Sequence, residues 1–381
     1  MSRRLLISCG EASGDLYAGA LTRELKALAP DLEIAGLGGP EFERAGGRVL
    51  VDFRGLSVTG FTEIVGKVPQ LRAAKRRLID EARKGVDALV VVDYYGFNGR
   101  LAREAHALGI PVIYYISPQV WAWRPGRIRI IREVSRRVLV IFPFEEAIYQ
   151  QAGVPVEFVG HPLVDLATSS TTREQLLGRL GLNPSAPTVA VLPGSRRSEL
   201  RRLLPTLVDA VGRIRAQVPD VQFVLARAPH LDDALLAPAM GVPGVAMVQG
   251  DTDGVLAAAD VVITASGTAT VQTALHGKPM VVVYRVSPLE YAIGRRFVKV
   301  DTFAMVNLIA GRRIVTELIQ DDFTADAVAA ETVALLRDEA RATSMREALA
   351  EVRAKLGGPG GSRRAAQAIL RTIGETCERS S

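Results

Sequence analysis

The chain has 381 residues, too many for one ordinary core, and its length fits two domains of about 150 to 200 residues each. Hydrophobic residues make up 48% of it and charged residues 23%, a globular balance that excludes a disordered or fibrous protein. The net charge is +6, and basic residues gather at 67–84 and 124–137, which indicates either solvated helix faces or a partner such as nucleic acid, anionic lipid or a phosphorylated substrate.

The apolar run at the start ends at Cys9, which is short for a signal peptide, and no stretch reaches the roughly 18 apolar residues of a membrane span. We therefore expect a cytoplasmic protein. Cys9 and Cys377 lie near opposite ends without the spacing of a metal site, so both are interpreted as structural or incidental.

The first half alternates β-branched apolar runs with amphipathic stretches, which predicts a doubly wound α/β domain. Strands are expected at residues 4–9, 33–37, 48–52, 86–92, 111–116, 136–141 and 156–159. Helices are expected at residues 15–28, 60–83, 98–108, 124–133 and 144–151. The unbroken apolar run at 88–92 is typical of a parallel strand that is buried on both faces.

The second half repeats this rhythm. Strands are expected at residues 188–192, 221–226, 245–248, 260–264 and 279–283, and helices at 198–216, 251–258 and 268–276. The polar segment 167–172 predicts a hinge, which gives a first domain at 1–167 and a second at 168–355. From about residue 324 the composition is helical, and the glycine-rich break at 357–361 lets a last helix near 362–373, within a terminal segment 356–381, pack on the first domain or on a neighbouring subunit.

Both halves open with a strand, a small-residue loop and a helix start, at residues 4–15 and 188–196. The pair predicts two nucleotide-binding-type domains with a cleft between them for two substrates. The first loop, Gly-Glu-Ala-Ser-Gly-Asp, is not G-x-G-x-x-G, which argues against a nicotinamide dinucleotide. Its residues either make a turn that the fold requires or place Glu11 and Asp15 in a substrate cleft.

Asp93 directly follows the buried apolar run, at the strand end where open α/β sheets bind ligands. Partial burial there would raise the pKa of its carboxyl towards the range of a general base, which makes Asp93 the leading catalytic candidate; the alternative is an N-cap for the next helix. Trp121 and Trp123 follow the next strand, and they pack either on a sugar face or acyl chain or on the domain's own core.

Two further loops at helix starts predict a phosphate site. Ser195 and nearby backbone N–H groups suit phosphate oxygens, and Arg196 suits a departing diphosphate without any metal. Ser266, Gly267 and Thr268 begin another helix and offer further donors. Together they form a two-sided phosphate cradle, with ordinary helix capping as the alternative for each.

Residues 57–84 place apolar side chains at helical spacing beside a basic cluster. Such a helix lies on an anionic membrane surface or packs on the sheet of its own domain. The pattern leaves both open.

Several motifs resemble those of the lipid-A-disaccharide synthase family, in order and spacing over nearly the whole chain. They are Gly-Glu-Ala-Ser-Gly-Asp at 10–15, Gly-Gly-Pro at 38–40, Ser-Pro-Gln-Val-Trp-Ala-Trp-Arg at 117–124, Pro-Phe-Glu at 143–145, Gly-His-Pro at 160–162, Leu-Pro-Gly-Ser-Arg at 192–196 and Ala-Ser-Gly-Thr-Ala at 265–269. The Trp-Ala-Trp-Arg segment is highly specific. The resemblance implies two Rossmann-like domains of the GT-B glycosyltransferase type.

The implied reaction transfers 2,3-diacylglucosamine from UDP to the 6-hydroxyl of 2,3-diacylglucosamine 1-phosphate, inverts the anomeric centre and gives a β-1,6-linked lipid A disaccharide in lipopolysaccharide biosynthesis. The resemblance makes Asp93 the base and gives Arg196 the diphosphate. Residues implied at UDP are Ser195, Ser266, Gly267, Thr268 and Gln272, with Asn307 and the following helix's Glu317 at the donor site or a subunit contact. Residues implied near the acceptor are Glu11, Ser13, Asp15, Asn98, Trp121, Trp123 and Arg124.

Three positions depart from the family pattern. Tyr95 and Val306 stand where proline is usual, and Gln272 stands where a glutamate commonly accepts hydrogen bonds from the ribose hydroxyls. Glutamine keeps one acceptor oxygen but loses the charge, which would weaken UDP binding by about 1 kcal/mol if that contact is made.

The family further implies a peripheral protein of the inner membrane in a Gram-negative bacterium, and a homodimer that exchanges C-terminal segments. No cofactor, metal or nucleic-acid partner is expected. The rival interpretations are another GT-B enzyme acting on UDP-N-acetylglucosamine, either a transferase of peptidoglycan precursor synthesis or a 2-epimerase, and a non-catalytic nucleotide- or lipid-binding protein.

Overall fold

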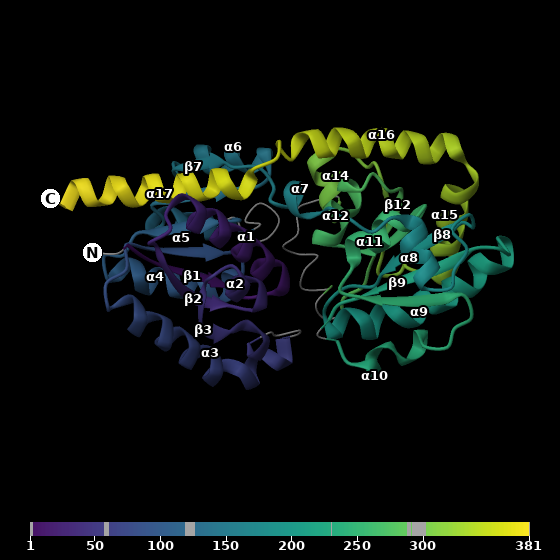
Figure 1. The fold of residues 1–381 in the computed structure, drawn as a ribbon, viewed down its shortest axis with the longest axis horizontal. Coiled ribbons are helices and arrows are strands. Elements are labelled where there is room, and N and C mark those ends of the chain that lie inside the picture. The colour runs from purple at the N-terminus through teal and green to yellow at the C-terminus, as the bar shows by residue number, and fades with distance from the viewer. Residues whose placement is uncertain are drawn as a thin grey trace. The chain divides into compact units, whose positions relative to one another are not determined.

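The computed structural model describes residues 3–56, 61–118, 126–229, 231–287, 291 and 302–380. The chain forms two compact units: unit 1 consists of Met1–Asp165 with Leu356–Ser381, and unit 2 of Leu166–Lys355. Each unit is a parallel sheet with helices packed on it (Figure 1). The predicted class of two doubly wound α/β domains with a helical tail is therefore confirmed. The first stretch of unit 1 ends at Asp165, close to the predicted hinge at 167–172, and the terminal segment from Leu356 also belongs to this unit.

Unit 1 is built on a seven-stranded sheet in the order β3-β2-β1-β4-β5-β6-β7. Its strands are β1 (Arg4–Cys9), β2 (Glu33–Gly38), β3 (Arg48–Asp52), β4 (Ala88–Val92), β5 (Val112–Tyr115), β6 (Arg137–Val140) and β7 (Val156–Phe158). Every pair is parallel, and β1 and β4 end in register with Cys9 opposite Val92. The continuous apolar residues of β4 are all fully buried, because helices cover both faces.

The helices of unit 1 follow its strands in alternation. They are α1 (Ala12–Leu28), α2 (Pro40–Arg44), a 3₁₀ turn η1 (Phe53–Gly55), α3 (Phe61–Ala82), α4 (Tyr95–Ala107), α5 (Arg127–Val134) and α6 (Pro143–Gln151), and α7 (Leu163–Leu166) leads into unit 2. The short α2 follows Gly39 and was not predicted, because five residues give no readable helical period.

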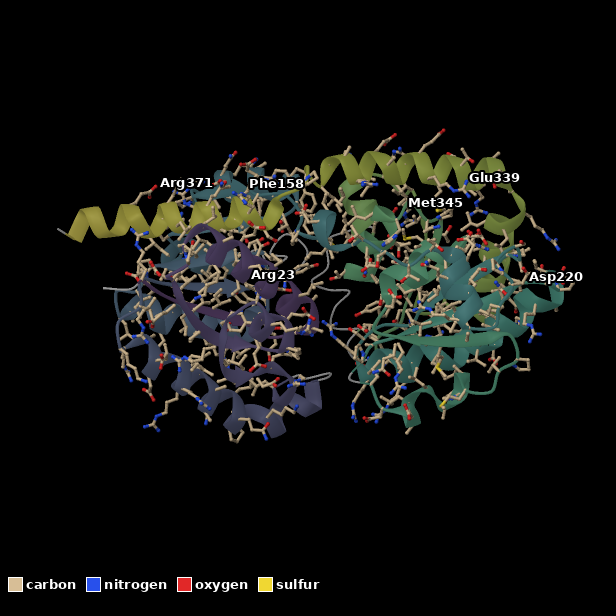
Figure 2. The ribbon with its side chains drawn as sticks, in the orientation of Figure 1. Arg23, Phe158, Asp220, Glu339, Met345 and Arg371 are labelled. Atoms are coloured by element: carbon tan, nitrogen blue, oxygen red, sulfur yellow. The ribbon has the colours of Figure 1, made fainter. Side chains whose placement is uncertain are left out.

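The terminal helix α17 (Gly361–Ser380) completes unit 1. It lies along α1 (Figure 1) and buries Ala365, Ala366 and Ile369. Arg371 of α17, labelled in Figure 2, donates to Glu157 of β7 at 2.9 Å. In this chain the helix therefore packs on the first domain, and its exchange with a neighbouring subunit stays a prediction.

Unit 2 is built on a six-stranded sheet in the order β10-β9-β8-β11-β12-β13. Its strands are β8 (Thr188–Leu192), β9 (Gln222–Arg227), β10 (Val245–Gln249), β11 (Val261–Ala265), β12 (Met280–Tyr284) and β13 (Thr316–Ile319). All of its pairs are parallel as well. The edge strand β13 was not predicted, because it reads Thr-Glu-Leu-Ile and lacks an apolar run.

The helices of unit 2 pack on its sheet and on one another. They are α8 (Arg173–Arg179), α9 (Arg197–Gln217), α10 (Asp233–Leu236), a 3₁₀ turn η2 (Ala237–Ala239), α11 (Thr252–Ala258), α12 (Thr268–Leu275), α14 (Met305–Ala310), α15 (Ala325–Arg337) and α16 (Glu339–Lys355). The backbone N–H of Met280 on β12 contacts the sulfur of Met345 on α16 at 3.2 Å (Figure 2).

Candidate active site

Both sheets reverse their strand order at one point, between β1 and β4 in unit 1 and between β8 and β11 in unit 2. Loops leave in opposite directions there, so the carboxyl end of such a sheet has a crevice that suits a ligand. In unit 1 the register of Cys9 with Val92 sets the loop at Gly10 beside Asp93. In unit 2 the pairing of Leu192 with Thr264 does the same for the two predicted phosphate loops.

Asp93 follows β4 and has an exposed side chain. The partial burial expected from the sequence is therefore wrong, because the carboxylate lies beyond the buried end of the strand. Its φ of 44° lies in the left-handed region, as does the 47° of Tyr94. Tyr94 is the N-cap residue of α4, so the alternative of an N-cap at Asp93 is also not what the structure has.

Asn98 is fully buried on α4, and both ends of its amide are bonded within unit 1. Its Nδ2 donates to the carbonyl oxygens of Asp93 at 2.8 Å, Ser8 at 3.1 Å and Val92 at 3.2 Å. Its Oδ1 accepts from the hydroxyl of Ser8 at 2.6 Å. This arrangement leaves the amide no room for the predicted acceptor contact.

The first opening loop contains three predicted acceptor residues, and one of them is turned inward. Asp15 is buried and accepts the backbone N–H groups of Gly39 at 2.7 Å, Glu41 at 2.9 Å and Phe42 at 3.1 Å. Burial raises the pKa of Asp15, against the effect of these donors. Asp15 thus caps α2, and its predicted contact with substrate is replaced by a structural one.

Glu11 and Ser13 are only half-buried, at the N-cap and in the first turn of α1. Their position at the carboxyl edge of the sheet keeps both as candidates for an acceptor contact. The predicted residues Trp121, Trp123 and Arg124 lie outside the described part of the chain.

In unit 2 the loop after β8 carries Ser195 and Arg196 to the start of α9. The backbone N–H groups of both donate to Glu199 at 3.2 Å, and the Arg196 guanidinium lies 3.3 Å from the same carboxylate. Arg196 is therefore the N-cap residue of α9, and the Glu199 side chain at the third helical position accepts its backbone N–H. A carboxylate thus already occupies the N–H groups predicted for phosphate, and Glu199 is a residue that sequence reasoning missed.

The loop after β11 carries Ser266 and Gly267 to the start of α12, where Thr268 is exposed. Gly267 has a φ of 142°, and apart from its chain neighbours no atom of the described residues lies within 4 Å of where a Cβ would project, which leaves space for a ligand beside the backbone. Ser266 donates its hydroxyl to the carbonyl of Phe303 at 3.1 Å. The strand pairing therefore places both predicted phosphate loops at one edge of unit 2.

Gln272 on α12 contacts an acidic residue that the sequence did not single out. Its Nε2 donates to Asp253 Oδ1 at 2.8 Å, and His276 Nε2 lies 2.8 Å from the same oxygen. Asp253 is in the first turn of α11, the helix that follows β10. The carboxylate that position 272 lacks in this chain is therefore present on the neighbouring helix.

Asn307 and Glu317 are hydrogen-bonded to each other in a partly buried network around the start of α14. Asn307 Nδ2 donates to Glu317 at 2.7 Å, and Glu317 accepts the backbone N–H groups of Phe303 at 2.8 Å and Ala304 at 3.0 Å. Glu317 lies on β13, so its expected place on a helix is wrong. These hydrogen bonds hold Phe303 and Ala304 in place, and the carbonyl of Phe303 is the group that accepts the hydrogen bond of the Ser266 hydroxyl.

The predicted membrane face of 57–84 packs inside unit 1 over its second half. On α3 the side chains of Ala74, Leu78 and Ile79 are buried in the core, with Leu71 packed against them, so from residue 71 onward the apolar stripe packs on the sheet. The side chains of residues 57–65 lie outside the description. Arg76 on the opposite face stays 85% exposed and keeps the basic character of the helix.

None of the described helices is long and apolar enough to cross a bilayer. In the same part of the chain, no three histidine, cysteine or carboxylate side chains gather as a metal would need.

Comparison with known families decides the relationship. The family model described as Lipid-A-disaccharide synthetase matches residues 5–372. The chain belongs to this family. It is 42% identical over 379 residues to the lipid-A-disaccharide synthase of Geobacter sulfurreducens, with 98% of each chain covered. It is 41% identical to that of Myxococcus xanthus, with 97% of each covered. Members of the family are glycosyltransferases.

Solved structures support the fold. The UDP-GlcNAc 2-epimerase of Neisseria meningitidis bound to UDP-GlcNAc superposes with a TM-score of 0.70 at 13% identity, covering 97% of this chain and 100% of the other. CalG4, the calicheamicin glycosyltransferase, superposes with a TM-score of 0.63 at 17% identity, with 98% of each chain covered. At these identities the likeness establishes the GT-B fold and leaves the choice of activity to the family.

Proposed function

We propose that this enzyme condenses UDP-2,3-diacylglucosamine with 2,3-diacylglucosamine 1-phosphate to form the β-1,6-linked lipid A disaccharide and UDP, with inversion at the anomeric carbon. The observation that carries the proposal is the family match over residues 5–372, which spans both switch points. The rival of an enzyme that acts on UDP-N-acetylglucosamine rests on the fold alone.

In this proposal Asp93 accepts the proton of the acceptor's 6-hydroxyl as that oxygen attacks the anomeric carbon. Its exposed position at the carboxyl end of β4 supports the assignment, because a base must reach the proton it removes. Glu11 and Ser13, at the start of the neighbouring helix α1, are proposed to contact the acceptor.

The departing UDP is assigned to unit 2. Arg196 is proposed to neutralise the diphosphate, and Ser195, Ser266, Gly267 and Thr268 to supply donors at the starts of α9 and α12. For the N–H groups of Ser195 and Arg196 to bind phosphate, the Glu199 carboxylate has to turn away. These groups stabilise the leaving group without a metal, so we expect turnover to persist in excess EDTA.

Both substrates carry acyl chains, which supports a place at the cytoplasmic face of the inner membrane of a Gram-negative bacterium. The exposed basic face of α3 is proposed to meet anionic lipid. A homodimer with exchanged terminal helices remains a proposal, tested by the concentration dependence of the molar mass in solution.

The test follows UDP release by the full chain in mixed micelles, with the defined donor present and the acylated acceptor present or absent. We expect UDP only when both are present, and a loss of about 10² to 10⁴-fold in kcat for Asp93→Asn. The matched control is Asp80→Asn, which removes an exposed carboxylate of α3 in the same unit. A near wild-type kcat for Asp93→Asn would show that Asp93 is not the base. Turnover of UDP-N-acetylglucosamine without acceptor would instead support an enzyme that acts on that sugar nucleotide.

A further inference from the structure

The loop after β4 has an unusual backbone. Asp93 has a φ of 44° and Tyr94 a φ of 47°, so two successive residues with side chains adopt the left-handed conformation. Such residues avoid this region because the Cβ approaches the backbone, and they stay there only where the surrounding structure holds them. The contacts around the loop therefore decide where the Asp93 carboxylate projects.

Asn98 makes the first of these contacts from beneath the loop. Its Nδ2 bonds the carbonyl oxygens of Val92 and Asp93 on one chain segment and of Ser8 on the neighbouring strand. The Ser8 hydroxyl donates to Oδ1, which fixes the orientation of the amide. One fully buried side chain thus ties the ends of β1 and β4 together.

Gly10 allows the second contact, from the neighbouring loop. A Cβ at Gly10 would lie 2.0 Å from Cδ1 of Tyr94, so the ring occupies the space that only glycine leaves open. The Tyr94 ring also stacks on Phe97 with centroids 5.9 Å apart. On the other side, the backbone N–H of Asp93 donates to the carbonyl of Ile116 at 3.1 Å.

We propose that Asn98 is a positioning residue for Asp93: with Ser8 it holds the left-handed loop and so aims the carboxylate at the acceptor hydroxyl. The proposal rests on the function proposed for Asp93. Loss of the Asn98 amide frees the Asp93 carbonyl, the backbone relaxes towards an extended conformation, and the carboxylate moves. Displacement of a reacting group by about 1 Å costs on the order of 10²-fold in rate.

The decisive measurement is a double-mutant cycle in kcat, with Asn98→Ala and Asp93→Asn made singly and together. We expect Asn98→Ala to lower kcat by about 10²-fold with little change in the KM of either substrate. In the Asp93→Asn background it should lower kcat no further, because it acts only through the carboxylate. A further 10²-fold loss in that background, or a raised acceptor KM with unchanged kcat, overturns the proposal.

Two milder variants keep the proposal testable if Asn98→Ala does not fold. Ser8→Ala removes only the donor to Oδ1, and Gly10→Ala displaces the Tyr94 ring. Each should lower kcat about tenfold with wild-type affinity for UDP, and wild-type kcat in both overturns the proposal. Ile369→Ala, buried in α17, is the control for lost stability: its melting temperature falls while kcat holds.

Failure of this inference can be told apart from failure of the proposed function. If Asp93→Asn alone keeps near wild-type kcat, the base is elsewhere and Asn98 has no carboxylate to position. If Asp93→Asn is inactive and Asn98→Ala keeps wild-type kcat, the base stands and the positioning role is wrong.

Discussion

The burial of the His161 ring predicts that the free energy of unfolding of unit 1 depends measurably on pH. It is 2% exposed, its Nδ1 accepts the backbone N–H of Leu163 at 3.1 Å, and its ring packs on Tyr17 and Phe142. Burial lowers the pKa of His161 from 6.5 to about 3. The native state therefore keeps a neutral ring at pH values where the unfolded chain takes up a proton.

The sign and size follow from proton linkage. The contribution is fully present above pH 6.5 and is lost as the pH falls towards 3, because only the unfolded state binds the proton in that window. The loss is about 1.4 kcal/mol per pH unit, or about 2.7 kcal/mol between pH 7.5 and pH 4.5. His161→Asn removes the titration and leaves an amide oxygen for the N–H of Leu163.

Urea unfolding followed by tryptophan fluorescence isolates this effect, since both tryptophans of the chain, Trp121 and Trp123, belong to unit 1. Wild type should be the more stable protein at pH 7.5, because His161→Asn loses the ring contacts. That advantage should shrink by about 2.7 kcal/mol at pH 4.5. A difference between the two proteins that stays constant over this range would refute a neutral, buried imidazole.

Three further changes test other sites. Arg196→Gln should lower kcat by about 10²-fold in the UDP-release assay, whereas the neighbouring Arg197→Gln, which loses only an ion pair to Asp232, should stay within about threefold of wild type. Asp15→Asn should lower the free energy of unfolding of unit 1 by about 1–3 kcal/mol in the same fluorescence experiment, because at least one backbone N–H at α2 loses its acceptor; an unchanged midpoint contradicts this. Gln272→Glu should lower the stability of unit 2 by about 1–2 kcal/mol at pH 8, because it sets a second carboxylate against Asp253, and calorimetry of the double variant with Asp253→Asn should show recovery.

The strands were largely predictable because each is a continuous apolar run. β1, β3 and β8 have the predicted bounds, and the position of Asp93 after β4 follows from the run alone. β13 was missed because an edge strand with Thr316 and Glu317 has no such run.

Side-chain direction was not predictable, because it depends on partners far along the chain. Asn98 and Asp15 were expected at a substrate, yet their partners are Ser8 and the backbone at 39–42. Periodicity likewise does not say whether the apolar stripe of α3 meets lipid or the sheet. The packing of Leu78 and Ile79 in the core decides that for the second half of the helix.

The return of α17 to α1 also orders events during synthesis. Unit 2 is one unbroken stretch of chain, so every residue it needs has been made once Lys355 is added. Unit 1 has to wait for the segment from Leu356 onward, and until then the side chains that pack beneath Ala365 and Ile369 lack their cover. Until this last helix has been made and released, the first unit therefore exposes apolar side chains, which is the kind of nascent surface that chaperones bind.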